Sequence, residues 1–143
     1  MDLNSKANNI ATGSVPITAT YPFLFFDRVL EQTSNSMELL KNTSADEWCA
    51  CSPGMIFPGW AVLEVMAQAA GRLGQALEPG TAYRNRLLAR IKHARFRRAV
   101  HSGEQLRIRV NLIKVFSNSM AMHVAVRTET GRIADADLYF FRF

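Results

Sequence analysis

The pattern of hydrophobic and polar positions is most clearly helical over residues 60–77, WAVLEVMAQAAGRLGQAL. At 100° per residue the apolar side chains cover a very wide arc, and they are Val62, Val65, Met66, Ala69, Ala70, Leu73 and Leu77. A helix that is apolar over most of its circumference is usually buried. A stop signal, Glu78-Pro79-Gly80, follows directly. The pattern therefore predicts one long, buried helix.

Strand patterns occupy most of the remaining chain. Residues 22–32 predict a buried strand, and residues 36–44 predict its hairpin partner across a turn at Thr33-Ser34-Asn35. Further strands are predicted at 86–100, 105–116, 119–128 and 132–143, with a turn at 101–104, whereas residues 44–59 are expected to be irregular. One long helix with several antiparallel strands is an α+β layout, and we expect the sheet to curl around the helix.

Length and composition favour a single domain. The chain has 143 residues, of which 48% are hydrophobic and 20% charged, which suits one globular core. Residues 1–20 are polar and without periodicity, so we expect a flexible N-terminal segment followed by one domain over residues 21–143. No signal peptide and no membrane-spanning run is visible, so the predicted location is the cytoplasm, without membrane association.

The positive charge is concentrated in one region. The net charge is +5, and a single acid, Glu104, accompanies nine basic residues between Arg84 and Arg109. Such a cluster favours an anionic partner, for which nucleic acid, an acidic carrier protein and a phosphorylated cofactor are the candidates. Nucleic acid is disfavoured because the flanking pattern is that of packed strands, with no stacking platform or groove-reading helix.

The cysteines and histidines do not predict a metal site. Cys49 and Cys51 are separated by one residue, so a disulfide between them would be strained. The three histidines, His93, His101 and His123, show no ligand spacing. We therefore predict neither a metal nor a cofactor.

Glu64 is the one acid on the predicted helix, and Gln68 follows it one turn later. A carboxylate in apolar surroundings favours its protonated form, which suits a general acid. The alternative is a buried structural acid paired with Arg72 or with a backbone group.

Three segments resemble the FabZ-type (3R)-3-hydroxyacyl-acyl carrier protein dehydratases: YPFLFFDRV (21–29), PGMIFPGWAVLEVMAQAAG (53–71) and KHARFRRAVHSGEQL (92–106). The resemblance implies a hot-dog fold, in which an antiparallel sheet wraps one central helix. It also implies that Glu64 is the catalytic acid, that the Gly59 N–H polarises the thioester carbonyl, and that Gln68 accompanies the acid.

The same resemblance implies the partners. The acyl chain would lie in an apolar tunnel along the helix, for which Phe57 and Trp60 are candidate walls. A basic rim would bind acyl carrier protein, and its candidates are Arg84, Arg95, Arg97 and Arg98. Members of the family are dimers or higher oligomers with sites built across the subunit interface.

The chain departs from the family at the base. Cys51 stands where the family has the histidine that removes the α-proton, and the interval between the two Pro-Gly pairs is one residue shorter. Cys51 is therefore a candidate base, a candidate nucleophile, or a small packed residue. The resulting hypotheses are a dehydratase that acts alone, an acyl-carrier-protein-binding subunit that lends Glu64 to a His-bearing partner in a heterodimer, and a hot-dog thioesterase.

Overall fold

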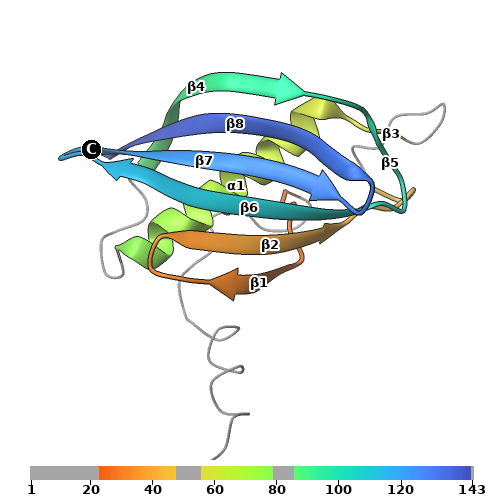
Figure 1. The fold of residues 1–143 in the computed structure, drawn as a ribbon, viewed down its shortest axis with the longest axis horizontal. Helices are drawn as coiled ribbons and strands as arrows, with labels where there is room; N and C mark the ends of the chain where they lie inside the picture. The colour runs from red at the N-terminus through yellow and green to blue at the C-terminus, as the bar shows by residue number, and fades with distance from the viewer. Residues whose placement is uncertain (1–22, 48–55, 79–85, 143) are drawn as a thin grey trace, which may run out of the picture.

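A six-stranded antiparallel sheet covers one face of a single helix in the computed structural model, which describes residues 23–47, 56–78 and 86–142. The sheet order is β1-β2-β6-β7-β8-β4, and Figure 1 shows helix α1 behind it. The elements are β1 (Arg28–Gln32), β2 (Ser36–Asn42), β3 (Ile56–Phe57), α1 (Gly59–Leu77), β4 (Arg86–Phe96), β5 (Val100–His101), β6 (Gln105–Val115), β7 (Ser119–Thr128) and β8 (Gly131–Arg142). This confirms the predicted α+β class.

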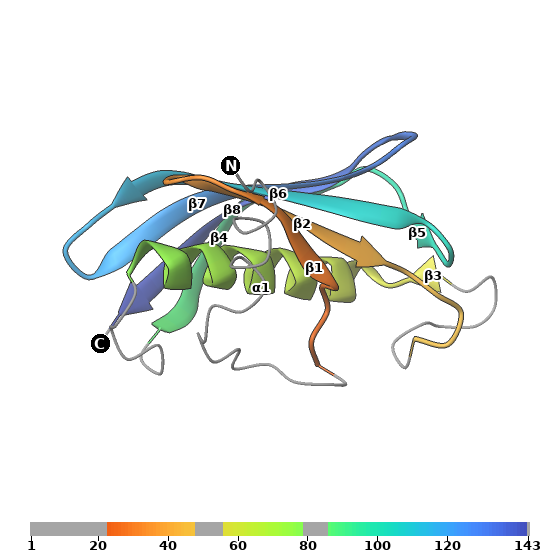
Figure 2. The same cartoon turned by 90° about the horizontal axis from the view of Figure 1, so that it is seen from below.

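The sheet arches over the helix, as Figure 2 shows from below. Helix α1 begins one residue before the predicted start and ends at the predicted Leu77. Its first turn closes on Pro58, whose carbonyl accepts bonds from the amides of Ala61 (3.0 Å) and Val62 (3.1 Å). Proline suits this position because it has no N–H to leave unpaired before the helix.

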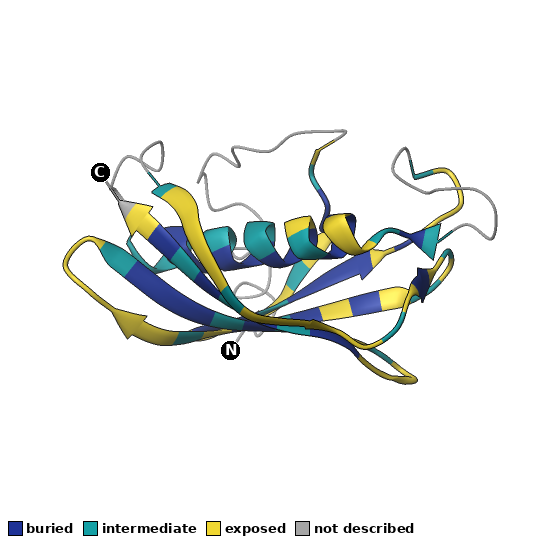
Figure 3. Cartoon of the chain, turned by 90° about the horizontal axis from the view of Figure 1, so that it is seen from above, coloured by how far each residue is buried: buried dark blue, intermediate teal, exposed yellow. Residues whose placement is uncertain are grey.

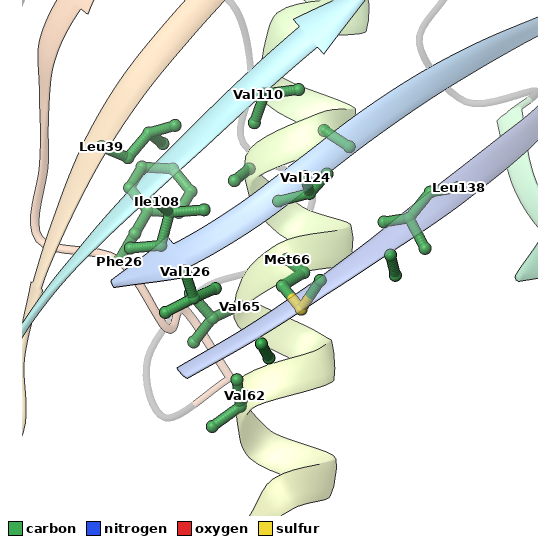
Figure 4. Packing of buried hydrophobic residues seen from close by; sticks show 14 of the residues in the cluster. Phe26, Leu39, Val62, Val65, Met66, Ile108, Val110, Val124, Val126 and Leu138 are labelled. Atoms are coloured by element: carbon green, nitrogen blue, oxygen red, sulfur yellow. The ribbon is translucent and has the colours of Figure 1, made fainter. Parts of the chain in front are cut away.

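The core lies between the helix and the concave face of the sheet. Figure 4 shows Val62, Val65 and Met66 of the helix packed against strand residues such as Val124, Val126 and Leu138. All these side chains are at most 2% exposed. Burying side chains of this kind contributes about 1.5–3 kcal/mol each, so this interface is the main source of stability. The predicted buried helix is confirmed.

The first predicted strand is too long. Strand β1 begins at Arg28, and Phe25 and Phe26 are buried in the chain that leads to it. The Asp27 carboxylate accepts a bond from the Asn42 amide at 2.6 Å, which fixes the chain where β1 begins. The predicted turn at 33–35 is confirmed, since the Thr33 hydroxyl accepts the amide of Ser36 at 3.1 Å.

Two short strands were missed. Residues 44–59 were predicted to be irregular, yet Ile56–Phe57 forms β3, which pairs antiparallel with β5. The predicted strand 86–100 breaks after Phe96, and the turn predicted at 101–104 begins one residue late because His101 belongs to β5. Both errors have one cause: this ladder joins segments more than forty residues apart, so no local pattern announces it.

Strand β4 forms one edge of the sheet. Nine of its eleven residues are exposed, and Figure 3 shows the strand largely in the colour of exposure. Among the described residues only β8 pairs with it. The exposed residues include the large apolar side chains Leu87, Leu88, Ile91 and Phe96. A long apolar edge of this kind is a template for pairing with another strand.

Candidate functional site

Glu64 is exposed on helix α1, on the side that the sheet does not cover. Figure 3 shows exposed positions at the N-terminal part of the helix, beside β3. Glu64 is therefore not a buried acid paired with Arg72, whose guanidinium donates instead to Gln75 at 3.1 Å. Glu64 also lacks the burial expected from the apolar helix pattern, because the helix packs against one sheet and this side of it is exposed.

Gln68 fixes the Glu64 carboxylate. Its Nε2 donates to Glu64 Oε1 at 2.9 Å and also to the carbonyl of Phe23. Its Oε1 accepts the amide of Phe25 at 2.9 Å. One amide side chain thus joins the acid to the segment that precedes β1. The predicted pair of Glu64 and Gln68 is in contact, and Gln68 is in a position to orient the carboxylate.

Replacing Gln68 by Met is expected to remove these bonds at similar side-chain volume. We expect an unfolding free energy lower by about 1–2 kcal/mol, because each such bond contributes about 1 kcal/mol. If Glu64 is catalytic, kcat should also fall about tenfold, which corresponds to about 1.4 kcal/mol of lost positioning. Urea unfolding and steady-state kinetics measure both quantities. Gln105→Met on the exposed surface is the matched control. Equal effects in the two variants would contradict the role of Gln68 in holding the Glu64 carboxylate.

Within the described residues no side chain caps the N-terminus of helix α1, and no acid lies in its first turn. The Gly59 amide precedes the first intrahelical donor, Ala61, and Gly59 is exposed. First-turn amides have no acceptor within their own helix, and together with the helix dipole they favour negative charge on a bound oxygen. This geometry suits the role that the resemblance implies for the Gly59 N–H.

Aromatic rings surround this helix entrance. Phe25 makes edge-to-face contacts with Phe57 and Trp60, each with ring centroids 6.3 Å apart and an interplanar angle of 80°. Phe57 is 2% exposed, whereas Trp60 is 52% exposed. A carbon placed at Cβ of Gly59 would lie 3.9 Å from the ring of Phe96 at the end of β4. The end of the edge strand therefore lies against the helix N-terminus.

The candidate carrier-protein residues differ in their surroundings. Arg97 donates to Asp135 at 2.7 Å, and Arg98 forms a double contact with Glu104 at 2.6 and 3.0 Å. Arg95 is exposed and makes no ion pair within the described part of the chain. Arg84 lies outside the described residues, as do Cys51 and the predicted N-terminal segment 1–20. Of the three rim candidates that the structure describes, Arg95 is the one that forms no ion pair with an acid in the described residues.

Arg98 organises the turn between β5 and β6. Besides Glu104 it reaches the hydroxyls of Thr128 (2.8 Å) and Thr130 (2.7 Å) in the β7–β8 turn. The hydrogen bond from Arg98, helped by the His101 amide, holds the pKa of Glu104 below its usual value, although burial opposes the shift. Two turns of the sheet are thereby tied together.

His93 and His123 lie on the sheet face opposite the helix. His123 alternates with the buried Met122 and Val124, so its side chain points outward. Its Nδ1 lies 2.7 Å from Asp137 Oδ1, and His93 Nδ1 lies 3.0 Å from Asp137 Oδ2. One carboxylate thus joins three neighbouring strands, away from the helix.

Asp137→Asn is expected to lower the unfolding free energy by about 1 kcal/mol at neutral pH. Burial raises the pKa of Asp137, but the hydrogen bonds from His123 and His93 outweigh it, so the folded pKa is depressed. A depressed pKa gives stability that is present above the unfolded value of about 3.9 and is lost as pH falls through the folded value. The difference from wild type should therefore shrink below about pH 4. Urea unfolding against pH measures it. Asp46→Asn is the control, and a difference independent of pH would contradict the assignment.

His101 is the histidine whose place the sequence reasoning missed. It was assigned to a turn, whereas it belongs to β5 and lies opposite Ile56, just before the helix. Only the ladder between β3 and β5 reveals this.

Among the described residues, no group of three or more His, Cys, Asp or Glu side chains has the arrangement of a metal site. In the same residues, no helix has the length and hydropathy needed to cross a membrane.

Solved structures with this arrangement include a dehydratase heterocomplex and a hypothetical thioesterase. The dehydratase heterocomplex ApeI:P from Xenorhabdus doucetiae has a TM-score of 0.72 at 19% identity, over 87% of this chain and 86% of that chain. A hypothetical thioesterase with coenzyme A from Streptococcus pneumoniae TIGR4 has a TM-score of 0.68 at 10% identity, over 81% of this chain and 84% of that chain. At these identities the likeness shows the fold, and it confirms the predicted hot-dog architecture.

Sequence comparison identifies the family. A family model described as a FabA-like domain matches residues 17–136. The 3-hydroxyacyl-acyl-carrier-protein dehydratase FabZ of Erwinia tasmaniensis is 40% identical over 121 residues, which cover 79% of this chain and 78% of that protein. FabZ of Symbiobacterium thermophilum is 42% identical over 97 residues, covering 65% of this chain and 68% of that protein. The chain therefore belongs to the FabA-like family, as a member of the FabZ type with a hot-dog fold.

Proposed function

We propose that the protein eliminates water from 3-hydroxyacyl thioesters of acyl carrier protein, giving the trans-2-enoyl thioester in fatty acid or polyene-type biosynthesis. The observation that carries the proposal is the Glu64 carboxylate, which is exposed one turn beyond the uncapped N-terminus of α1 and is held by Gln68. The curated relatives named above are dehydratases of this substrate class.

The elimination needs an acid, a donor for the developing enolate charge, and a base. Glu64 is the acid that protonates the departing β-hydroxyl. The Gly59 N–H is the donor to the thioester oxygen, with the helix dipole behind it. Exposed Trp60 and buried Phe57 line the entrance for the acyl chain. No step requires a metal or an organic cofactor. Cys51 has the sequence position of the family base and remains a candidate for it.

A second subunit completes the proposed site. The long exposed edge of β4 is the surface through which we propose that two chains pair. Since Phe96 of β4 lies against Gly59, pairing along this edge places the second chain beside the helix entrance. The acidic carrier protein would approach the basic residues of this region, of which Arg95 is the described candidate without a matching acid. Homodimers or higher homo-oligomers are the expected assemblies.

The test is to give purified protein a 3-hydroxyacyl-acyl carrier protein substrate and to follow the products by mass spectrometry. The expected product is the enoyl thioester, 18 mass units lighter through loss of one water. Release of the free carrier thiol without dehydration would identify a thioesterase instead. Absence of both products would contradict a catalytic role for this protein acting alone.

A heteromeric dehydratase is the second candidate. Cys51 favours this candidate. A chain with Cys51 in place of the family histidine keeps the proposed acid, Glu64, but lacks the family base. A fold neighbour, ApeI:P, is itself a dehydratase heterocomplex. In this arrangement the chain lends Glu64 to a His-bearing partner. Turnover that appears only after a second dehydratase is added would support this candidate.

A further inference from the structure

We propose that His101 is the general base that removes the Cα proton of the substrate, in place of the histidine absent at position 51. This inference rests on the proposed dehydration. The β3–β5 ladder, the fixed backbone of residue 101 and the location of the other histidines support it. In sequence His101 is remote from the Pro-Gly motif, so only the fold brings it to the helix entrance.

The β3–β5 ladder places His101 at the end of the fold where helix α1 begins. The register pairs Ile56 with His101 and Phe57 with Val100, and only Phe57 and Pro58 separate Ile56 from Gly59. Phe57 and Val100 are 2% and 1% exposed. Because side chains alternate along a strand, Ile56 and His101 share the other face of this ribbon. Figure 2 shows β3 and β5 at the N-terminal end of α1.

The segment that carries His101 begins beside the helix entrance and ends on the strand that pairs with β3. It starts at Phe96, whose ring lies 3.9 Å from a Cβ position at Gly59, and it ends on β5 beside β3. Residues 96–101 therefore lie at the end of the fold where α1 begins. A base on this segment and a donor at Gly59 belong to one region of the molecule.

The backbone of His101 is held on both sides. Its amide donates to the Glu104 carboxylate at 2.8 Å, and its carbonyl accepts the Thr43 hydroxyl at 3.2 Å. Arg98 in turn fixes Glu104. The imidazole is exposed and makes no hydrogen bond or ion pair within residues 23–47, 56–78 and 86–142. A rigid backbone with an unengaged imidazole is the arrangement that a positioned base requires.

The other two histidines are unsuited to this role. His93 and His123 both contact Asp137 on the outer face of the sheet. The sheet lies between that face and helix α1, which carries Glu64. His101 is therefore the one histidine in this chain that the described fold brings to the end of the sheet where α1 begins.

The proposed step moves protons and electron pairs only among the substrate, His101 and Glu64. Neutral His101 accepts the Cα proton, and the electrons of that C–H bond form the Cα–Cβ double bond as the Cβ–O bond breaks. Glu64 gives its proton to the departing hydroxyl, which leaves as water. The imidazolium and the Glu64 carboxylate then exchange one proton through solvent, which restores both groups.

The experiment compares His101→Gln, His101→Ala, Glu64→Gln and Cys51→Ala with wild type on the 3-hydroxyacyl carrier-protein substrate. His101→Gln should lower kcat at least about 100-fold, the usual contribution of general base catalysis. It should also remove the dependence of kcat/KM on pH that a general base produces. Added imidazole should restore turnover to His101→Ala. Loss of turnover in Cys51→Ala would identify Cys51 as the base and overturn the inference. His93→Asn is the matched histidine control and should retain turnover.

The outcomes separate this inference from the proposed function. If wild type is active and Glu64→Gln is not, but His101→Gln retains kcat within about threefold, the base lies elsewhere and the dehydratase stands. Loss of activity in His101→Ala that imidazole does not restore would mark a structural role and overturn the inference. A wild-type protein that is inactive alone, or active only with a second dehydratase, overturns the inference together with the stand-alone enzyme.

Discussion

Replacing Glu64 by Gln is expected to lower kcat at least about 100-fold, with little change in the free energy of unfolding. The amide keeps the size of the side chain and can still contact Gln68, so the fold should be preserved. It has no proton to give to the leaving hydroxyl, so the elimination loses its acid. The same carrier-protein assay measures the loss, and thermal unfolding confirms that the variant is folded.

The control for this variant is Glu129→Gln, the same change at an exposed position in the β7–β8 turn. It should leave kcat unchanged, because Glu129 lies in the turn between β7 and β8 and not on the helix that carries the proposed acid. If wild type is active and Glu64→Gln retains more than about a third of its kcat, Glu64 is not the acid. A fall in both variants would instead indicate a general effect of surface charge on carrier-protein binding.

Replacing Leu73 by Ala is expected to lower the free energy of unfolding by about 2–5 kcal/mol. Leu73 is fully buried in the cluster between α1 and the sheet. The shorter side chain loses its transfer free energy and leaves a cavity that the packed sheet fills only in part. Urea unfolding at a fixed protein concentration measures the change, since pairing of chains makes apparent stability depend on concentration.

Leu30→Ala is the matched control for the core variant. Leu30 is 37% exposed on β1, so the same chemical change should cost less than about 1 kcal/mol. Similar losses at both positions would show that the sheet does not close over the helix as described. A loss at Leu73 alone confirms that the helix–sheet interface carries the stability of the domain.

The helix and the long strands were predictable because their patterns are local. The wide apolar arc from Val62 to Leu73 predicts a buried helix, whichever element packs on it. The alternation of apolar and polar residues in β6 predicts a strand with one buried face. The pairing of Glu64 with Gln68 also follows from helical spacing, since positions four apart are neighbours. Such features depend on the chain within a few residues of each position.

The surroundings of the charged groups were not predictable in the same way. Nine basic residues between positions 84 and 109 read as one cluster, yet Arg97 and Arg98 meet Asp135 and Glu104 in the fold. Arg97 and Asp135 are 38 residues apart in sequence. Strand order determines which basic side chains form ion pairs and which do not. Local residue spacing does not reveal that order.

The family resemblance, the central helix and the place of Glu64 on that helix follow from residues close together in the chain, so they could be predicted without tertiary information. The exposure of Glu64, the location of His93 and His123 on the outer face, and the position of His101 beside the strand that enters the helix became visible only in the fold. The physical reason is that hydrogen-bonded ladders join distant segments. The position of a side chain across such a ladder is set by register, which exists only once the sheet has formed.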